Sequence, residues 1–405
     1  MKKYKIICTG KIELGVVTPG GEYPMYEYPE LLEIKTQLNL AKHKLDQYAA
    51  KLDSYNNPYR ELQGPRGILE KEYGAEYVSN AWTKMYEICN EFPEFLDRSR
   101  PFITFHLAEA PGSFLLATNH WMKTNAPGVK WVWFANSYVN ANGIREDEMY
   151  LTDRYGLAAK YPERWLFGIE GNGDITSPEN IKHYDNSLRR ECQHLFGISG
   201  VSQLVDVVTS DVKYAPGGDN YYDEEERYNI PVNFGQVIAA IQTLRPGGNM
   251  FLKQFTFFES ASVCLMYIIC CCFQIVEIVK PETSKPANSE IYVWARGFKY
   301  TNRKTLLNSL YAYLHHIRYM NNGDPVPAPI PMNLVYSGLI SQLTQISREL
   351  AESQIQHINN MVLEIASGNP PGSYEEKCYT WIEENKIKHL TPGDELTAKR
   401  RSADA

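Results

Sequence analysis

Two charged residues stand at the ends of short apolar segments in this chain. Asp211 follows the run VDVVTS, and Lys253 lies in MFLKQF between Leu252 and Phe255. A carboxylate in that position is either the cap of a turn or part of a site, and the lysine is either an edge residue whose ammonium reaches solvent or a buried group. Burial lowers the pKa of a lysine, so a buried Lys253 needs a partner and is a candidate for proton-transfer chemistry.

Polar residues follow three further β-like segments. The turn Glu109–Phe114 comes after FITFHLA, Asn136 and Ser137 end KWVWFANSY, and Asp174 lies in GNGDIT. In open α/β sheets, ligands bind beyond the carboxyl ends of the strands, so these positions are candidates for a binding site. Asn136 and Ser137 can hydrogen-bond a ribose or an amino acid, and Asp174 can accept a hydrogen bond from an exocyclic amine.

The stretch FHLAEAPGSFLLATNH has the form of a strand, a tight glycine turn and a helix. Such a corner holds nucleotide-like ligands, because glycine lets the backbone approach closely and the helix start presents free N–H groups. The turn has only Gly112 and therefore lacks both G-x-G-x-x-G and G-x-x-x-x-G-K-[ST]. Both phosphate-binding interpretations of the turn are therefore weak, and a dinucleotide-dependent dehydrogenase is excluded on this ground.

The elements that must position these residues alternate along the chain. Between 75 and 300, six β-rich segments are separated by helical patterns, which predicts an α/β fold with a mostly parallel sheet covered on both faces. Residues 1–74 are expected to form an N-terminal extension with helical spacing over 30–56. Residues 301–405 are expected to form a helical C-terminal region, with two amphipathic helices around the proline-rich GDPVPAPIPMN and a disordered tail.

Composition limits the class of protein. The 405 residues are 43% hydrophobic, and the net charge of −7 excludes a uniformly basic surface, so any nucleic-acid contact would come from a local patch. The longest apolar run, ASVCLMYIICCCFQIV, is too short to cross a bilayer and predicts a buried helix. Eight cysteines without a CxxC pair favour free thiols over a metal site. With no secretory signal at the N-terminus, a cytoplasmic protein is expected.

Six stretches together resemble the FtsJ-like S-adenosylmethionine-dependent RNA ribose 2′-O-methyltransferases, and they occur in that family's order. The resemblance covers about 75–300 and implies a Rossmann-like methyltransferase domain. Three stretches look closest to the cap-2 type of messenger-RNA methyltransferase and to FtsJ-like proteins of large DNA viruses: EAPGSF, WLFGIEGNGDI and KPETSKPANSE. The six are VSNAWTKMYE, HLAEAPGSF, WLFGIEGNGDIT, VVTSDVKYAPGG, GGNMFLKQF and KPETSKPANSEIYVWARG.

The resemblance implies a role for each candidate residue. The family's Lys-Asp-Lys-Glu tetrad matches Lys84, Asp211, Lys253 and Glu290, with Lys253 as the base or as the group that orients the hydroxyl. To accept a proton, Lys253 would need a pKa about three units below the ordinary value of ~10.4. The charge of Lys84 would lower this pKa, whereas the two acids would oppose the fall, so the protonation state of Lys253 stays open. No metal is implied. The implied cofactor site consists of Glu109, Ala110, Pro111, Gly112, Ser113 and Phe114 for the methionine part of S-adenosylmethionine, Asn136 for its ribose and Asp174 for its adenine.

Two positions depart from the family pattern. Gly112-Ser113 replaces two glycines, and Glu109 replaces a small apolar residue. Ser113 is expected to cap the helix that follows, and Glu109 to contact the cofactor amine, which leaves the affinity for the cofactor open.

The expected function is methylation of a ribose 2′-hydroxyl in RNA, at the first or second transcribed nucleotide of capped messenger RNA, with the transcription or capping machinery as a possible partner. Two alternatives are kept. One is a catalytically silent module of the same fold that binds RNA or a transcription complex, and the other is a methyltransferase for ribosomal or transfer RNA. For a viral protein the location would include the virion.

Overall fold

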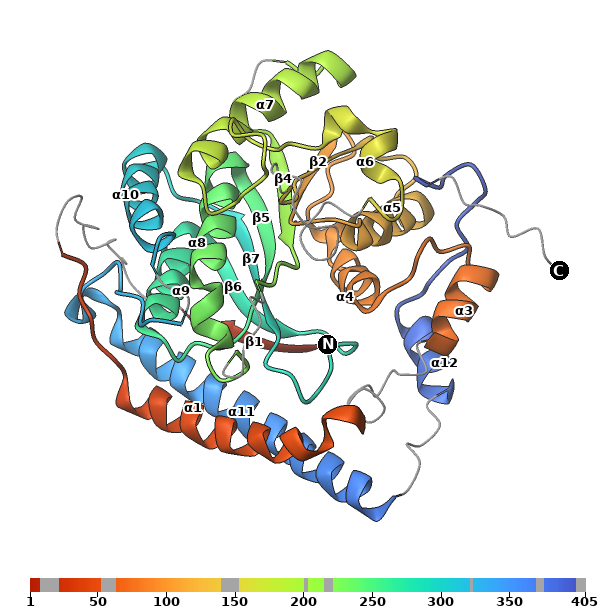
Figure 1. Cartoon of the computed structure of the whole chain (residues 1–405). Coiled ribbons are helices and arrows are strands. Elements are labelled where there is room, and N and C mark those ends of the chain that lie inside the picture. Colours follow the sequence, from red (N-terminus) through yellow and green to blue (C-terminus); the bar gives the residue numbers. More distant parts are fainter. Residues whose placement is uncertain are drawn as a thin grey trace.

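A seven-stranded sheet forms the centre of the molecule in the computed structural model, and helices cover both of its faces (Figure 1). The structure describes residues 1–7, 22–51, 63–139, 153–199, 203–214, 221–320, 323–368 and 375–397. The polar tail and Cys8 lie outside these ranges. The strands are β1 (Lys2–Ile6), β2 (Phe102–Leu107), β3 (Trp131–Ala135), β4 (Val205–Ser210), β5 (Leu244–Gln254), β6 (Phe273–Lys280) and β7 (Ile291–Phe298).

All six strands predicted from the sequence are confirmed as β2 to β7, but the sheet is mixed rather than mostly parallel. Its strand order is β1-β6-β7-β5-β4-β2-β3. The pairs β2–β3, β2–β4 and β4–β5 are parallel, whereas β5–β7, β6–β7 and β1–β6 are antiparallel. The connection from Lys280 to Ile291 is too short for a helical crossover, so β6 and β7 must run in opposite directions.

Side chains on the two faces of the sheet belong to two separate cores. Along β2, Phe105 packs into one core and Phe102 into the other, and along β5 the same division separates Leu252 from Phe251. Both faces are therefore buried, as the continuous apolar runs predict. The helices are α1 (Pro29–Lys42), α3 (Gln63–Glu72), α4 (Asn80–Cys89), α5 (Ser113–Asn125), α6 (Leu157–Lys160), α7 (Pro178–Phe196), α8 (Glu225–Thr243), α9 (Ser260–Cys272), α10 (Arg303–Ile317), α11 (Ser337–Ser367) and α12 (Glu375–Glu384).

The apolar run that begins at Ala261 forms α9, in which every residue is buried. The helix ends at Cys272, and β6 follows immediately, so the last residues of the run belong to the sheet. The predicted buried helix is confirmed over Ser260–Cys272. Among the described parts of the chain, no helix is long and apolar enough to span a membrane.

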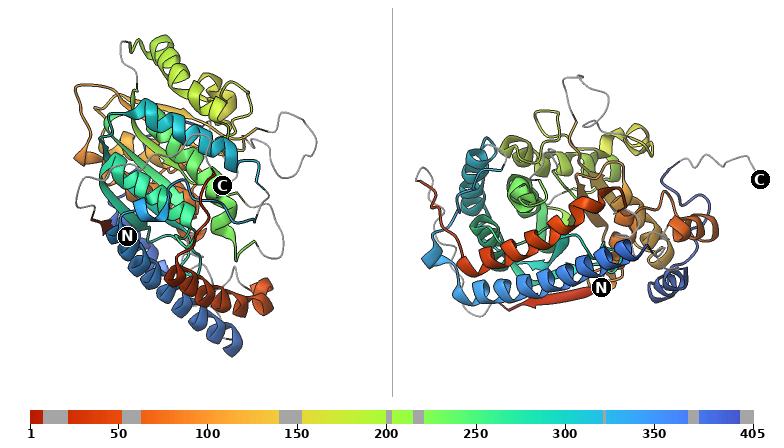
Figure 2. Two further views of the ribbon diagram at one scale, coloured as in Figure 1. Left: turned by 90° about the vertical axis from the view of Figure 1, so that its left-hand side faces the viewer. Right: turned by 60° about the horizontal axis from the view of Figure 1, so that its bottom comes forward.

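The two flanking regions contribute to the same globule. The helix predicted over 30–56 is present as α1, with a 3-10 helix from His43 to Lys51. Helix α1 packs along α11, and the two lie side by side in both views of Figure 2. Strand β1 pairs with β6 at the edge of the sheet. The predicted extension therefore supplies a strand and a helix to the fold, although the boundaries near 75 and 300 remain predictions.

Candidate active site

Four charged side chains from four separate segments meet at one edge of the sheet. Lys84 Nζ lies 2.5 Å from Glu290 Oε1. Lys253 Nζ lies 2.9 Å from Glu290 Oε2 and 3.2 Å from Asp211 Oδ1. The contacts form a continuous chain in the order Lys84, Glu290, Lys253, Asp211. The structure thus brings together the four residues that the sequence analysis assigned to the tetrad.

Sheet topology explains why these residues meet. β4 and β5 are adjacent and parallel, so Asp211 after β4 and Lys253 near the end of β5 reach the same edge. β7 runs antiparallel to β5, with Lys253 paired to Tyr292, so Glu290 enters the sheet at that edge. Lys84 comes from α4, which starts at a Ser79 cap and packs against α5.

The charge state of Lys253 follows from these contacts. Burial alone lowers the pKa of its ammonium, but the Asp211 and Glu290 carboxylates outweigh burial, and the net pKa is raised. Burial also opposes ionisation of Glu290, yet Lys84 and Lys253 hold the pKa of this carboxyl well below its usual range. A lysine that accepts a proton needs the opposite shift. Of the two roles considered for Lys253, the geometry therefore favours orienting a hydroxyl over acting as the base.

Three further residues support the tetrad and were missed in the sequence. Tyr292 donates a hydrogen bond from its hydroxyl to Asp211 Oδ1 at 2.6 Å, and Ser284 donates to Glu290 Oε1 at 2.9 Å. Lys280 Nζ donates to the carbonyl oxygens of Asn288 and Glu290. The signal for Tyr292 was its spacing of two from Glu290, which places both side chains on one face of a strand.

The turn after β2 has the backbone shape that the sequence predicts. Gly112 has φ of +122°, and a Cβ added there would lie 2.3 Å from Leu157 Cδ1. The turn is held against the end of β3, because Ala110 N donates to Ser137 Oγ at 2.8 Å and Glu109 N donates to the carbonyl oxygen of Asn136 at 2.9 Å. The sharp turn therefore depends on glycine at position 112.

The two departures from the family pattern have different outcomes. The expectation that Ser113 caps α5 is wrong: Gly112 is the N-cap, and Ser113 Oγ accepts a hydrogen bond from Ser79 Oγ. The side chain of Glu109 occupies the capping position, since its Oε1 accepts from Leu115 N at 2.8 Å. A carboxylate suits the start of a helix, where N–H groups are free. Contact between Glu109 and the cofactor amine remains a prediction.

Asn136 and Asp174 are both engaged within the protein. Asn136 Nδ2 donates to the carbonyl oxygens of Leu166 and Gly173 and to the Tyr184 hydroxyl. Asp174 accepts from Thr176 and forms an ion pair with Arg318 at 3.1 Å. Their roles toward ribose and adenine remain predictions.

Two buried oxygens test whether the edge suits S-adenosylmethionine. Asn136 Oδ1 and Ser210 Oγ have no hydrogen-bond partner among the described residues. Asn136 follows β3, and Ser210 is the last residue of β4. These strands are the two neighbours of β2, so the two residues flank the glycine turn on both sides. Acceptors left open there fit a ligand that donates hydrogen bonds, as ribose hydroxyls and an amino group do.

The buried carboxyl of Glu109 yields a pH prediction. Burial raises its pKa to about 8, although the helix N–H groups oppose the shift. Between about pH 4.5 and 8, the carboxyl is protonated in the folded state and ionised in the unfolded state. The free energy of unfolding therefore falls as the pH rises through that window. We expect Glu109→Gln to stabilise the protein at pH 9 by on the order of 1–4 kcal/mol and to have no effect at pH 4.

Urea unfolding of both proteins at the two pH values measures this difference, with the exposed Glu163→Gln as the matched control. An equal effect of Glu109→Gln at pH 4 and pH 9 would show that the carboxyl does not titrate in this way.

A sheet with this strand order, a glycine turn after its first parallel strand and charged side chains at the same edge defines a Rossmann-like methyltransferase. The chain matches the profile of the FtsJ-like methyltransferase family over residues 77–298, more than half of its length, and belongs to that family. Its cofactor is S-adenosylmethionine.

The chain is also similar to several curated proteins. The chain is 33% identical to cap-specific mRNA (nucleoside-2′-O-)-methyltransferase 2 of Danio rerio, over 67% of this chain and 35% of the relative. It is 32% identical to uncharacterized protein L511 of Acanthamoeba polyphaga mimivirus, over 85% and 41%. It is 30% identical to "probable methyltransferase EP424R" of African swine fever virus, over 63% and 59%. The chain thus spans less than two thirds of the length of each of these relatives.

Human methyltransferase-like protein 13 in complex with SAH is 14% identical and has a TM-score of 0.30, over 59% of this chain and 92% of that one. The family assignment rests on the profile match.

Proposed function

We propose that this chain transfers the methyl group of S-adenosylmethionine to a ribose 2′-hydroxyl of RNA, at the first or second transcribed nucleotide of capped messenger RNA. The observation that carries the proposal is the complete Lys84, Glu290, Lys253, Asp211 chain of contacts at the sheet edge beside the cofactor turn. The cap-specific activity in the name of the Danio rerio relative supports the substrate class. Capping enzymes or the transcription machinery are the proposed partners.

The tetrad can position a weak nucleophile. Lys253 directs N–H groups at Asp211 and Glu290, and an ammonium has three, so one remains among the described contacts to donate to a 2′-oxygen. That donation leaves a lone pair of the same oxygen for attack in line with the methyl group. Lys84 neutralises the inner carboxylate, Glu290, and keeps the array rigid.

Asp211 is the proposed acceptor of the hydroxyl proton. Its side chain is 21% exposed, against 6% for Glu290, so it faces the side from which a substrate must arrive. Tyr292 and Lys253 both contact Oδ1, and Oδ2 has no partner within the described ranges. A carboxylate oxygen at hydrogen-bond distance from a 2′-hydroxyl can take its proton as the new O–C bond forms.

The cofactor would be held by the turn Glu109–Phe114 with Asn136 and Asp174, and when bound it supplies a methyl group on a positively charged sulfur. The silent-module alternative has no use for two buried lysines and two acids in mutual contact, because burying such charges is costly without a reaction to serve. The ribosomal or transfer RNA alternative is left to the experiment.

Transfer of labelled methyl from S-adenosylmethionine to RNA tests the proposal. Capped, cap-1 and uncapped transcripts of one sequence are compared, and the labelled nucleotide is identified after nuclease digestion. We expect label in the ribose of the first or second nucleotide of capped transcripts only. Label at internal positions, or equal label in uncapped RNA, would favour another RNA class. Transfer to none of the transcripts, together with no binding of S-adenosylmethionine, would favour the silent module.

A further inference from the structure

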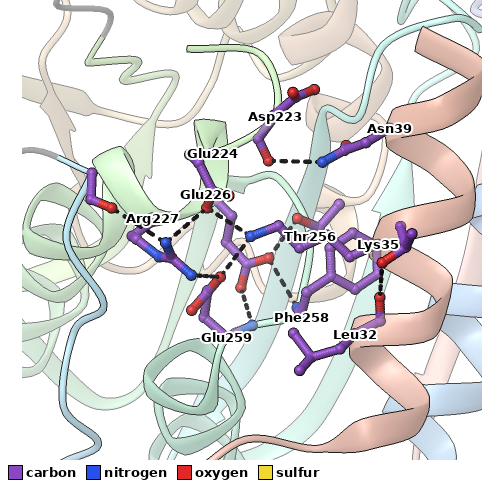
Figure 3. A network of polar contacts seen from close by, with 12 residues as sticks. Leu32, Lys35, Asn39, Asp223, Glu224, Glu226, Arg227, Thr256, Phe258 and Glu259 are labelled. Atoms are coloured by element: carbon purple, nitrogen blue, oxygen red, sulfur yellow. Dashed lines mark hydrogen bonds and ion pairs between the residues drawn. The ribbon is translucent and has the colours of Figure 1, made fainter. Parts of the chain in front are cut away.

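A half-buried network of charges joins α1 to the segments that follow Asp211 and Lys253 (Figure 3). Lys35 of α1 lies with its Nζ 2.6 Å from Glu224 Oε2 and 2.9 Å from Glu259 Oε1. Arg227 contacts the same two carboxylates at 3.2 and 3.0 Å. The side chains of Lys35 and Glu259 are only 11% and 10% exposed. Two cations thus hold two carboxylates from separate parts of the chain at a fixed separation.

One of these segments, residues 255–259, directly follows Lys253 and the end of β5. Glu226, at the start of α8, accepts hydrogen bonds from Thr256 Oγ1 at 2.6 Å and from the backbone N–H groups of Phe258 and Glu259 at 2.9 Å each. Figure 3 shows this carboxylate between the segment and the Lys35 ammonium. The path of the chain beyond Lys253 is therefore set by the first turn of α8 and by α1.

The other segment follows Asp211. Tyr214 N donates to Asn229 Oδ1 at 2.7 Å, and Asn229 Nδ2 donates back to the carbonyl oxygen of Tyr214 at 3.1 Å. Asn229 lies in the first turns of α8, next to Glu226 and Arg227. The first turns of α8 thus bind the chain after Asp211 on one side and the chain after Lys253 on the other.

From these contacts we infer that Lys35 is a positioning residue for the tetrad, and that α1, outside the family match of 77–298, is part of the catalytic unit. Lys35 holds Glu224 to Glu259 and thereby sets the separation between Asp211 and Lys253, whose ion pair is 3.2 Å long. The inference rests on the proposed methyl transfer for its kinetic test. Without the Lys35 ammonium, Arg227 is left as the single cation between Glu224 and Glu259 among these contacts. Repulsion between the two carboxylates is then only partly offset, and we expect the two segments to move apart.

Replacement of Lys35 by methionine tests the inference, because methionine keeps the length of the apolar stem and removes the charge. We expect kcat for RNA methylation to fall at least tenfold, with KM for S-adenosylmethionine within about threefold of wild type. Lys35→Arg should recover most of the rate, since it restores a cation. Lys44→Met is the matched control, because Lys44 lies next to α1 and its exposed side chain has a single polar partner among the described residues, Asn359 Oδ1.

The outcomes separate this inference from the proposed function. Kinetics are compared at equal folded fraction, and if Lys35→Met does not fold, Glu224→Gln replaces it with the same expectation of lower kcat. Unchanged kcat, or loss in Lys35→Arg equal to that in Lys35→Met, overturns the inference. If the wild type methylates no RNA, the proposed function fails. The positioning role of Lys35 is then tested by hydrogen exchange alone. Faster exchange of residues 256–259 in Lys35→Met, with 113–116 unchanged, supports positioning, and unchanged exchange in both overturns it.

Discussion

Lys253→Met is expected to abolish methyl transfer, with kcat lowered at least about 10³-fold, which corresponds to about 4 kcal/mol of transition-state stabilisation. Lys253 is the only tetrad member that contacts both acids, so its loss removes the N–H that orients the ribose oxygen and also the link between Asp211 and Glu290. Binding of S-adenosylmethionine should change little, because the described hydrogen bonds that hold the cofactor turn come from Ser137 and Leu115 and do not involve this side chain. Single-turnover transfer of labelled methyl and calorimetric cofactor binding measure the two effects.

The control for this variant is Lys3→Met, at the edge strand β1, where the lysine pairs with Glu91 on the surface. The pH dependence of the wild-type rate is a second readout. Because the Asp211 and Glu290 carboxylates raise the pKa of Lys253, its ammonium stays protonated across the neutral range. The rate should therefore not increase between pH 7 and 9, as it would if Lys253 had to lose its proton to act as the base. A Lys253→Met enzyme with more than a tenth of the wild-type kcat would exclude Lys253 from the mechanism proposed above.

Gly173→Ala is expected to lower the affinity for S-adenosylmethionine at least tenfold and to destabilise the fold by about 2–4 kcal/mol. Gly173 has φ of +68°, and a Cβ there would lie 1.8 Å from the carbonyl oxygen of Ser137, closer than any contact can be. The loop must then move away from the end of β3. That movement breaks the hydrogen bond from Asn136 to the Gly173 carbonyl and displaces Asp174, the two residues assigned to the ribose and adenine.

Gly171→Ala separates the clash from backbone strain. Gly171 has φ of +71° and lies in the same loop, but a Cβ there meets nothing within 4 Å. Both substitutions carry the cost of a left-handed alanine, on the order of 1 kcal/mol, and only Gly173→Ala adds the collision with Ser137. Chemical unfolding and cofactor titration of the two variants measure the difference. Similar losses in both would show that close packing of this loop on β3 does not support cofactor binding.

The strands of the sheet were accessible from sequence because their signal is local. β4 and β5 carry apolar residues on both faces, as strands buried on two sides do, and each delivers one charged residue at its end. The pairing directions were less accessible. The β6–β7 hairpin follows from a connection of ten residues that contains no helix. The antiparallel β5–β7 register, in which Lys253 pairs with Tyr292, then brings Glu290 to the edge where Lys253 lies rather than to the far edge.

The sequence by itself predicted which four charged residues meet at the sheet edge, because their motifs, in this order, resemble those of the family. It also determined the glycine turn, since Gly112 is the residue that can adopt the required φ. Only the tertiary structure decided the charge state of Lys253, because a pKa depends on distances to Asp211 and Glu290 that no sequence spacing contains. The same holds for Glu109, which is turned to the start of α5, and for Lys35, whose partners are 189 and 224 positions away. Electrostatic interactions act through space, and the fold alone brings these distant charges within reach of one another.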